Sequence, residues 1–379
     1  MINFYMEAKN RKSVIIVSPS LDPTVNVSGV SSVVNFIVSN NKNVNYIHFQ
    51  QGKADKESGG TITRLKRVIN NFFEWKTFLS QNSDTLIHYN LSMDTNSILR
   101  DVPFIVYAYK KNRNIVAHIH GGKYLFQKDR PWIIKKFLNK LFSMNISFIV
   151  LSDREKKVLD RDYDKQNIHV LPNVIDLTEA KGFNRILNPN RLDILFLGRI
   201  IEEKGIEFIF SACKELKRRN LNFVLHIAGK ETIPGLYLKH FEESLGDKFF
   251  RYEGVVSGIT KTELLKKCNV FLLPSYYEGL PMSLLEAMSF GEIPVVTNVG
   301  SIGKVVVDGD NGIFVDVKDS KSIVKAIYRL FKDENLHFKL SKKARNTIFE
   351  RFNPKEYIDK LNMIYASTPR KLSLGKTLM

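Results

Sequence analysis

The chain has few cysteines and no long apolar run. Cys213 and Cys268 are its only two cysteines in 379 residues, and they lie far apart. Their spacing suggests neither a metal site nor a disulfide framework, and it is compatible with a reducing cytoplasm. No apolar stretch approaches the ~18 residues that a membrane-spanning helix needs. The run Ser13–Ser18 has the length of a strand and ends at Pro19, so we expect no signal peptide.

Acidic residues are scarce relative to basic ones. The sequence has 39 Asp and Glu against 57 Lys and Arg, a formal net charge of +18. A solvated basic surface is the simplest explanation, but an excess of this size also favours an anionic partner. No zinc-finger spacing and no RNP-type aromatic signature supports nucleic acid. We therefore expect no nucleic-acid partner, and we favour an anionic membrane first and phosphorylated substrates second.

Short apolar runs alternate with helix-length amphipathic stretches along the whole chain. This alternation predicts parallel sheets with helices on both faces, and the length of the chain favours two domains. The expected strands are Val14–Val17, Val44–Phe49, Thr85–His88, Ile115–Ile119, Phe148–Leu151, His169–Leu171, Asp193–Leu197, Phe223–Ala228, Val270–Leu273 and Ile293–Thr297. The expected helices are Val30–Ser39, Arg130–Phe142, Asp153–Asp160, Gly205–Arg219, Thr262–Cys268, Met282–Phe290 and Pro354–Ala366.

A seam between two α/β units lies near residues 172–191, where proline, asparagine and glycine are crowded. Such loop chemistry marks a linker. It divides the chain into an N-terminal domain of residues 1–180, a second domain of residues 181–353, and a C-terminal helix with a basic tail, 354–379. We expect that last segment to pack back on the N-terminal domain. The carboxyl ends of the strands should face a cleft between the domains, because ligands bind there in open α/β sheets.

The richest stretch for chemistry runs from Leu273 to Met288. A strand ends at Pro274, a loop carrying Glu278 and Gly279 follows, and Pro281 occupies the first turn of the next helix. Glycine lets backbone approach a ligand closely, and the unpaired N–H groups of a helix start can bind an anion. Glu286 lies about two turns into that helix. Either glutamate alone would be common near a helix start. The loop, the glycine, the proline and both glutamates together indicate a binding loop.

A second stretch follows the strand Asp193–Leu197. Gly198, Arg199 and Lys204 lie there, at the expected carboxyl edge of the sheet. Two fixed cations suit a diphosphate, since arginine offers a bidentate fork and lysine a point charge. Ordinary ion pairs with Glu202 and Glu203 are the simpler alternative.

These two stretches resemble the donor-binding domain of the GT-B retaining glycosyltransferases, specifically the large family numbered four. The family pattern of two glutamates separated by seven residues appears as Glu278 and Glu286, preceded by Pro274-Ser275 and followed by Ala287-Met288. The pattern Gly-Arg-x4-Lys-Gly matches residues 198–205, and Gly-x-Pro-Val-Val matches 291–296 with one extra residue. The turn at 308–313 also matches, so the resemblance covers most of residues 190–350.

The resemblance implies the fold and a role for each position. The fold would be GT-B, two doubly wound Rossmann-like domains whose parallel sheets face each other across a cleft. The second domain would bind a nucleotide-sugar donor and the first an acceptor. Arg199 and Lys204 would bind the diphosphate and replace a metal, so neither a metal nor a cofactor is expected. Glu286 would bind the ribose, while Glu278 with the backbone of Gly279 and Leu280 would contact the sugar. Gly198 and Pro281 complete the donor loops.

The family pattern is weaker elsewhere. Gly229-Lys230-Glu231 stands where the family often has Gly-x-Gly, and Gly254 with Val255 is expected against the base. Pro172-Asn173-Val174-Ile175-Asp176 resembles the family's hinge, with Val174 in place of glycine.

The N-terminal half resembles the family more loosely. The family commonly has two adjacent glycines that bind phosphate at residues 28 and 29. Here Ser28 replaces the first glycine, and Gly29 remains as the second. His120, just before two glycines, matches the cleft histidine that would touch the transferred sugar. For His118 we expect a hydrogen bond to a loop carbonyl instead.

Two basic amphipathic stretches lie in the N-terminal half, 64–79 and 130–142. Each combines aromatic residues, among them Trp75 and Trp132, with lysine and arginine, as interfacial helices do. Packing on the protein's own sheet is the alternative for either helix. A polyprenyl-diphosphate-linked acceptor would explain both the charge and the aromatic residues, and it predicts a cytoplasmic protein bound to the inner face of the membrane.

The combined expectation is a retaining, metal-independent hexosyltransferase. It would move a sugar from a nucleotide-diphosphate sugar to a glycan or lipid-linked acceptor in bacterial surface polysaccharide synthesis, such as O-antigen, capsule or exopolysaccharide. The catalytic set would be His120, Glu278, Arg199 and Lys204. A nucleotide-sugar epimerase or a phosphorylase on the same fold is one alternative, although no pyridoxal phosphate lysine motif is present. A non-catalytic basic module that binds nucleic acid or anionic glycan is another.

Overall fold

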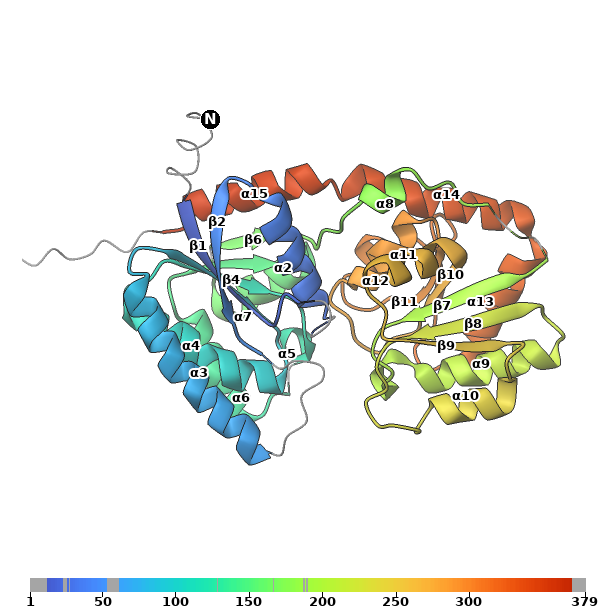
Figure 1. Ribbon diagram of the computed structural model, residues 1–379, viewed down its shortest axis with the longest axis horizontal. Helices are drawn as coiled ribbons and strands as arrows, with labels where there is room; N and C mark the ends of the chain where they lie inside the picture. Colours follow the sequence, from blue (N-terminus) through green and yellow to red (C-terminus); the bar gives the residue numbers. More distant parts are fainter. Residues whose placement is uncertain are drawn as a thin grey trace, which may run out of the picture. The chain divides into compact units, whose positions relative to one another are not determined.

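The structure is a computed structural model that describes residues 12–22, 26, 28–52, 61–127, 129–165, 167–186, 188 and 190–369. The chain forms two compact units. The described residues up to Asn173 and from Lys355 onward form the first, and Val174–Pro354 form the second. The division after Asn173 lies inside the proline- and asparagine-rich stretch 172–191. Each unit is built on one sheet (Figure 1).

The first unit contains a six-stranded parallel sheet in the order β2-β1-β3-β4-β5-β6. Strand β1 is apolar and buried on both faces, as expected when helices cover both sides of a parallel sheet. Val14–Val17, for example, are completely buried. The strand bounds are β1 Lys12–Ser18, β2 Val44–Gln50, β3 Leu86–Leu91, β4 Ile115–Ile119, β5 Ser147–Val150 and β6 Ile168–Val170.

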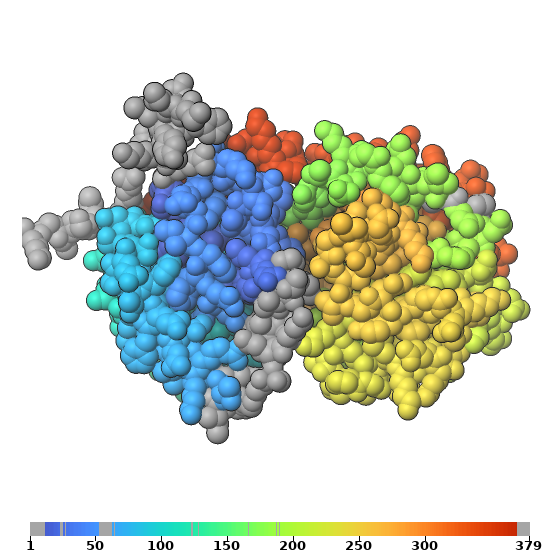
Figure 2. Space-filling model, viewed as in Figure 1, coloured from blue at the N-terminus to red at the C-terminus, as the bar shows by residue number. Residues whose placement is uncertain are grey.

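In the described part of the chain, six helices lie between these strands. They are α2 Gly29–Asn40, α3 Thr61–Gln81, α4 Thr95–Lys110, α5 Lys123–Phe126, α6 Trp132–Phe142 and α7 Asp153–Tyr163. Helix α4 packs between α3 and α6, and these three cover the same face of the sheet (Figure 1). Trp75 of α3 lies completely buried in this core, and its indole N–H donates to the carbonyl of Phe104 at 3.2 Å. The opposite side of α3 lies on the surface of the unit (Figure 2).

The second unit contains another six-stranded parallel sheet, in the order β12-β11-β10-β7-β8-β9. Its strands are β7 Leu192–Leu197, β8 Phe223–Ala228, β9 Phe250–Gly254, β10 Val270–Leu273, β11 Ile293–Thr297 and β12 Ile313–Val315. Its α-helices are α8 Thr178–Lys181, α9 Ile206–Arg218, α10 Leu238–Leu245, α11 Gly258–Lys267, α12 Met282–Ser289, α13 Ser320–Lys332 and α14 Glu334–Arg351. Short 3-10 turns occupy Glu202–Lys204 and Ile302–Lys304.

The two parallel sheets with flanking helices confirm the α/β class predicted from the alternation of apolar runs. Helix α6 begins at Trp132 rather than at the predicted Arg130, because Pro131 disfavours a helical conformation for the residue before it. The sequence did not predict α4, which accommodates Pro103 in its interior. Helices α10, α13 and α14 and the three-residue strand β12 were also missed.

The C-terminal helix α15, Pro354–Ser367, belongs to the first unit. The hydroxyl of Tyr365 lies 2.7 Å from Nδ1 of the buried His88 on β3. The amide of Asn41, at the end of α2, donates to Asn362 Oδ1 at 2.8 Å. These buried polar contacts fix the rotation of α15 on the sheet, since a helix turned by one residue would leave them unpaired.

Replacing Tyr365 with phenylalanine should lower the stability of the first unit. The change removes the hydrogen-bond partner of Nδ1 in the completely buried imidazole of His88, which costs about 1–3 kcal/mol. Both tryptophans of the sequence, Trp75 and Trp132, lie in the first unit, so urea denaturation followed by tryptophan fluorescence reports on it selectively. Tyr277→Phe, at a side chain that is 66% exposed in the second unit, is the control. Equal stability of the two variants would contradict the contact's role.

Candidate functional site

Three glycines meet where β7, β8 and β9 end. Gly229 has a φ of +144°, and a Cβ at this position would lie 1.8 Å from the carbonyl oxygen of Gly198. The N–H of Gly198 donates to the carbonyl of Ala228 at 3.0 Å, and that of Gly229 donates to Gly254 at 2.7 Å. The loops after three adjacent strands are therefore bonded through their backbones, and side chains have no room between the first two.

The loop after β10 is held on one side by the turn that contains Lys204. Gly205 has a φ of +73°, and a Cβ there would lie 2.3 Å from the carbonyl oxygen of Pro274. The N–H of Tyr276 donates to the carbonyl of Glu203 at 2.8 Å. This close approach of backbones requires glycine at 205, the position at which the sequence pattern has it.

The same loop is held on its other side by the residues that follow β11. A Cβ on Gly300, whose φ is +58°, would lie 1.8 Å from the carbonyl oxygen of Glu278. The N–H of Ser301 donates to the carbonyl of Gly279 at 2.9 Å. Glu278 and Gly279 are thus fixed by backbone contacts before any side chain is considered.

Lys204 and Glu278 form an ion pair across this junction. Lys204 Nζ lies 2.5 Å from Glu278 Oε1, and the hydroxyl of Ser275 donates to the same oxygen at 2.7 Å. Both side chains are largely shielded from solvent, so their mutual attraction is stronger than that of a surface pair. Lys204 therefore does not pair with its sequence neighbours Glu202 and Glu203, the simpler alternative considered from the sequence.

Glu286 also has a lysine partner. Its Oε1 lies 2.8 Å from Nζ of Lys261, which comes from α11, and both side chains remain partly accessible. Sequence reasoning missed Lys261, because nothing in its local pattern distinguishes it from the other lysines of α11. The first helical turn of α11 follows Gly254 and Val255 closely in the chain, so this pair connects the segment expected near the base to α12.

The remaining predicted donor residues lie on the same loops. Arg199 is exposed, and the structure shows no partner for it among the described residues. Val255 is half exposed and Leu280 is buried. Pro281 is the N-cap of α12 rather than a residue of its first turn. This corrects the sequence prediction: the extended backbone of Pro281 ends the loop, and α12 begins at Met282 with no side-chain cap.

The departure from the family pattern at Glu231 has a structural explanation. Its Oε1 accepts hydrogen bonds from the N–H groups of Tyr237 and Leu238 at 2.6 and 2.9 Å, and its Oε2 accepts from Gly235 at 2.7 Å. Glu231 therefore caps the start of α10, whose free N–H groups need acceptors. Burial alone would raise the pKa of Glu231, but these backbone hydrogen bonds outweigh it and lower that pKa.

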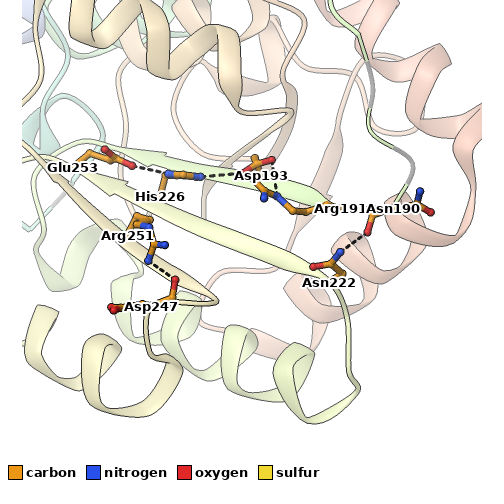
Figure 3. A network of polar contacts seen from close by, with 8 residues as sticks. All are labelled: Asn190, Arg191, Asp193, Asn222, His226, Asp247, Arg251 and Glu253. Carbon is orange, nitrogen blue, oxygen red and sulfur yellow. Dashed lines mark hydrogen bonds and ion pairs between the residues drawn. The ribbon is translucent and has the colours of Figure 1, made fainter.

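A polar network fixes the register of β7, β8 and β9 below these loops (Figure 3). The ring of the buried His226 lies between two carboxylates, with Nε2 3.1 Å from Asp193 and Nδ1 2.7 Å from Glu253 (Figure 3). Burial would raise the pKa of Asp193, but hydrogen bonds from His226 and Arg191 outweigh it and lower that pKa. Since Glu253 directly precedes Gly254, the network anchors the strand end that carries the predicted base-binding residues.

In the first unit, His120 follows β4 and is bonded to β3 twice. Its N–H donates to the carbonyl of Leu91 at 2.9 Å, and its Nε2 lies 2.8 Å from Oδ1 of Asn90. Gly122, with a φ of +121°, would place a Cβ 2.6 Å from the backbone of Met93. The loop after β4 is thus packed against the loop after β3, and the ring of His120 has a fixed position.

The sequence predicts a hydrogen bond between His118 and a loop carbonyl, and this prediction is wrong. Nδ1 of His118 lies 3.1 Å from Nε2 of His88, because the two side chains are on the same face of adjacent strands. Its ring also lies against that of His120, with centroids 4.0 Å apart. Burial lowers the pKa of His88 and of His120 to about 3, and it lowers the pKa of His118 well below its usual value.

Gly29 begins α2, and Ser28 is its N-cap, with the Ser28 hydroxyl accepting from the N–H of Ser31. Residues 23–25 and 27, which precede this start, lie outside the described residues. Among the described residues, the predicted positions of the second unit therefore lie on the loops after its strands and, for Glu286, on α12, whereas His120 and Gly29 lie in the first unit. No local signal in the sequence distinguishes Asn90 or Lys261, whereas Ser275 belongs to the Pro274-Ser275 pair of the family pattern.

Comparison with known proteins identifies the family. Residues 179–347, which contain both lysine–glutamate pairs, match the family described as Glycosyl transferases group 1. This segment belongs to the glycosyl transferases group 1 family.

Curated relatives of this glycosyltransferase family match both units in part. An N,N'-diacetylbacillosaminyl-diphospho-undecaprenol alpha-1,3-N-acetylgalactosaminyltransferase from Campylobacter jejuni is 32% identical over 59% of this chain and 62% of its own length. A UDP-Gal:alpha-D-GlcNAc-diphosphoundecaprenol alpha-1,3-galactosyltransferase from Escherichia coli is 28% identical over 66% of this chain and 68% of its own length. The chain thus spans less than two thirds of the Campylobacter enzyme.

Solved structures of similar proteins show the same fold. Sucrose-phosphate synthase from Thermosynechococcus elongatus superposes with a TM-score of 0.76, 17% identity, and coverage of 94% of this chain and 98% of its own. HepE from Anabaena, in complex with UDP and glucose, gives a TM-score of 0.70 at 13% identity, with 94% and 100% coverage. The chain therefore has the GT-B fold, as its sequence resemblance predicts.

Two further properties concern the described residues of the chain. None of their helices combines the length and hydropathy that a bilayer span requires. Cys213 and Cys268 are both buried and free.

The three neighbouring histidines should make the first unit sensitive to acid. Each stays neutral in the folded unit but is protonated below about pH 6.5 when unfolded, so the unfolded chain binds more protons between about pH 6.5 and 3. Stability should therefore fall as pH falls through that window, by about 2 kcal/mol per histidine at pH 5. Urea midpoints from tryptophan fluorescence at several pH values measure this dependence.

The slope with pH separates this effect from a general loss of packing. His118→Gln should reduce the slope, whatever it does to stability at pH 7. His240→Gln, at an exposed residue of α10, should leave the slope unchanged. A stability that is constant from pH 7 to 5 in the wild-type protein would show that the histidines are already protonated or exposed.

Proposed function

We propose that the chain is a retaining glycosyltransferase that moves a sugar from a nucleotide-diphosphate sugar to a glycan or lipid-linked acceptor. The observation that supports this most strongly is the Lys204–Glu278 ion pair, held at 2.5 Å on loops that are fixed by close backbone contacts. These loops follow the strands of a parallel sheet, which is where ligands bind in open α/β proteins. They also lie within the segment that belongs to the glycosyl transferases group 1 family.

In this proposal the second unit binds the donor. The cations Arg199 and Lys204 neutralise the diphosphate, with Gly198 allowing its close approach. Glu278, with the backbone of Gly279 and Leu280, contacts the transferred sugar. Further donor contacts come from the ribose partner Glu286, from Gly254 and Val255 beside the base, and from Pro281 and Gly29. Lys261 is added to this set, because it holds one oxygen of Glu286 and leaves the other to receive a ribose hydroxyl.

The proposed reaction transfers the sugar with retention. The bond between the anomeric carbon and the phosphate oxygen breaks, and the diphosphate leaves with the bonding electron pair. The acceptor hydroxyl oxygen bonds to the anomeric carbon on the same face, and its proton passes to the departing phosphate oxygen. Lys204 and Arg199 stabilise the charge that develops on the diphosphate, the kind of fixed electrostatic stabilisation that often contributes most to catalysis. His120 is the first unit's proposed contact with the transferred sugar.

We also propose that this chemistry is independent of a metal ion. The support is positive charge that is already in place: Lys204 is fixed by Glu278, and Arg199 is exposed next to Gly198. Two such side chains can supply the charge that a divalent ion would otherwise bring to a diphosphate.

The acceptor is proposed from the relatives. By their names, the Campylobacter and Escherichia coli relatives both act on sugars that are linked to diphospho-undecaprenol. A polyprenyl-diphosphate-linked acceptor is therefore our proposal for this chain, in the synthesis of a bacterial surface polysaccharide. Because such an acceptor is held in a membrane, the proposal includes a cytoplasmic protein bound peripherally to the inner face of the cytoplasmic membrane.

The first unit carries an exposed apolar and basic surface that supports this location. On α6, Trp132 is 74% exposed, and Lys135, Lys136 and Lys140 are exposed beyond it. On α3, Leu65 and Phe73 are each 60% exposed. Trp75 is excluded from this surface because it is completely buried, which corrects the expectation that it could enter a lipid interface. Helix α3 thus packs on the core with one side and exposes apolar residues on the other.

The donor proposal is tested by binding and turnover with a panel of nucleotide sugars. Calorimetry should detect one donor, and Glu286→Gln should weaken its binding by about 10- to 100-fold, since a charge-assisted hydrogen bond contributes about 1.5–3 kcal/mol. Lys204→Met should abolish most transfer, whereas Lys325→Met, exposed on α13, should have no effect. Transfer should survive EDTA.

Two outcomes would contradict the donor proposal. Unchanged donor affinity in Glu286→Gln would remove the ribose assignment. A complete loss of transfer in EDTA that Mg²⁺ restores would show that the two cations do not replace a metal.

The membrane proposal is tested by co-sedimentation with anionic and neutral vesicles. Each basic residue near an anionic surface contributes about 1 kcal/mol, and salt screens the attraction. Binding to anionic vesicles should therefore fall at high salt and in the double variant Lys135→Glu, Lys136→Glu. The double variant Lys339→Glu, Lys342→Glu makes the same charge change on α14 of the second unit and should bind like the wild type. No binding at low salt would overturn the proposal.

A further inference from the structure

Asn90 is buried at the end of β3, next to the proposed catalytic histidine. Its side-chain Nδ2 donates to the carbonyl oxygen of Val17 at 3.0 Å, and its Oδ1 lies 2.8 Å from Nε2 of His120. A backbone carbonyl can only accept a hydrogen bond. The amide of Asn90 must therefore direct its NH₂ toward Val17 and its oxygen toward His120.

This orientation decides which nitrogen of His120 carries the proton. Because Asn90 Oδ1 can only accept, Nε2 of His120 must be the donor, and in a neutral imidazole the other ring nitrogen then has a lone pair. Burial favours the neutral ring. Among the described residues, the structure shows no hydrogen bond to Nδ1 of His120.

The backbone around His120 supports the same orientation. The N–H of His120 donates to the carbonyl of Leu91, directly after Asn90, and the N–H of Met93 donates to the carbonyl of Gly121 at 2.7 Å. The ring of His118 packs against the ring of His120. These contacts hold His120 beside Asn90, so the hydrogen bond between the two side chains forms without a rotation of the ring or a shift of the loop.

We infer that Asn90 is a positioning residue that holds His120 as the neutral Nε2–H tautomer and leaves its Nδ1 as a hydrogen-bond acceptor. An acceptor nitrogen recognises a group that donates a hydrogen, such as a sugar hydroxyl, and it cannot donate to a phosphate oxygen. Resting on the function proposed above, this assigns His120 to a hydroxyl group of the sugar rather than to the diphosphate. His120 then contributes no positive charge to the binding of the phosphates.

The direct test is ¹⁵N NMR of the full-length protein with labelled histidine, which distinguishes the two neutral tautomers and the imidazolium ion. The chain has eight histidines, and the resonances of His120 are identified by their loss in His120→Gln. The wild type should show His120 as the Nε2–H tautomer at pH 7.5. Asn90→Leu, which offers no acceptor, should give a mixture of the two tautomers.

Asn90→Asp keeps the acceptor but adds a negative charge. A carboxylate next to an imidazole favours its protonated form, so His120 should become an imidazolium ion over a pH range in which the wild-type ring is neutral. Raising the pH should restore the neutral Nε2–H form, because the carboxylate still accepts from Nε2. Transfer by this variant should accordingly shift its pH profile toward alkaline pH, with the loss at neutral pH appearing mainly in kcat. Asn45→Asp, on β2 away from His120, is the control for the charge change.

Two NMR results would overturn the inference. One is an Nδ1–H tautomer or an imidazolium ion at His120 in the wild type at pH 7.5. The other is a tautomer that is the same in the wild type and in Asn90→Leu. Because these readouts need neither donor nor acceptor, they decide the role of Asn90 even if the protein transfers no sugar, and a failure of the proposed function remains distinguishable.

Discussion

The second unit depends on a steric constraint, the close approach of backbones where β7 and β8 end. A side chain at Gly229 would overlap the carbonyl oxygen of Gly198 there. The same kind of contact recurs between Gly205 and Pro274 and between Gly300 and Glu278. Gly229, Gly205 and Gly300 all have a positive φ, and their close contacts fix the loops. The loops in turn fix Lys204 and Glu278. The position of the ion pair follows from backbone geometry. The two charges add selectivity for a ligand to loops that the backbone contacts already fix.

The two units use different chemistry at their strand ends. In the second unit, each proposed donor carboxylate has a lysine partner, Glu278 with Lys204 and Glu286 with Lys261. Such pairs orient the carboxylates without a ligand. In the first unit, His120 is surrounded by neutral partners, Asn90 and His118. Under the proposed function, Lys204 meets a phosphate, whereas His120 offers a hydrogen-bond acceptor to a sugar hydroxyl.

The sequence was most informative where the signal is local. Four strands, among them Ile115–Ile119 and Phe223–Ala228, have the bounds that their apolar runs predict, because a parallel strand buried on both faces reads as one continuous run. Helix α4 was missed because Pro103 interrupts its pattern, and β12 because three residues carry too little pattern. The motifs around Glu278 and Lys204 were readable because glycine and proline mark the loops that carry them.

The partners of the candidate residues could not be read from the sequence. Lys261 lies 25 residues before Glu286, Asn90 lies 30 residues before His120, and Lys204 lies 74 residues before Glu278. Only the order of the strands brings each pair together. Trp75 and Trp132 show the same limit, since similar basic, aromatic helices bury one of them and expose the other. Burial depends on which face of the helix meets the sheet, and a single amphipathic stripe with aromatic residues on several sides does not decide that.

The central claim is that the fixed loops at the carboxyl edge of the second sheet bind a nucleotide diphosphate. Hydrogen–deuterium exchange with and without UDP, GDP and dTDP measures this without an acceptor or a known sugar. The account predicts that at least one nucleotide slows exchange in residues 198–205 and 274–286, with no comparable change in α13 or α14. No protection by any of the nucleotides, or protection confined to segments outside these loops, would contradict it.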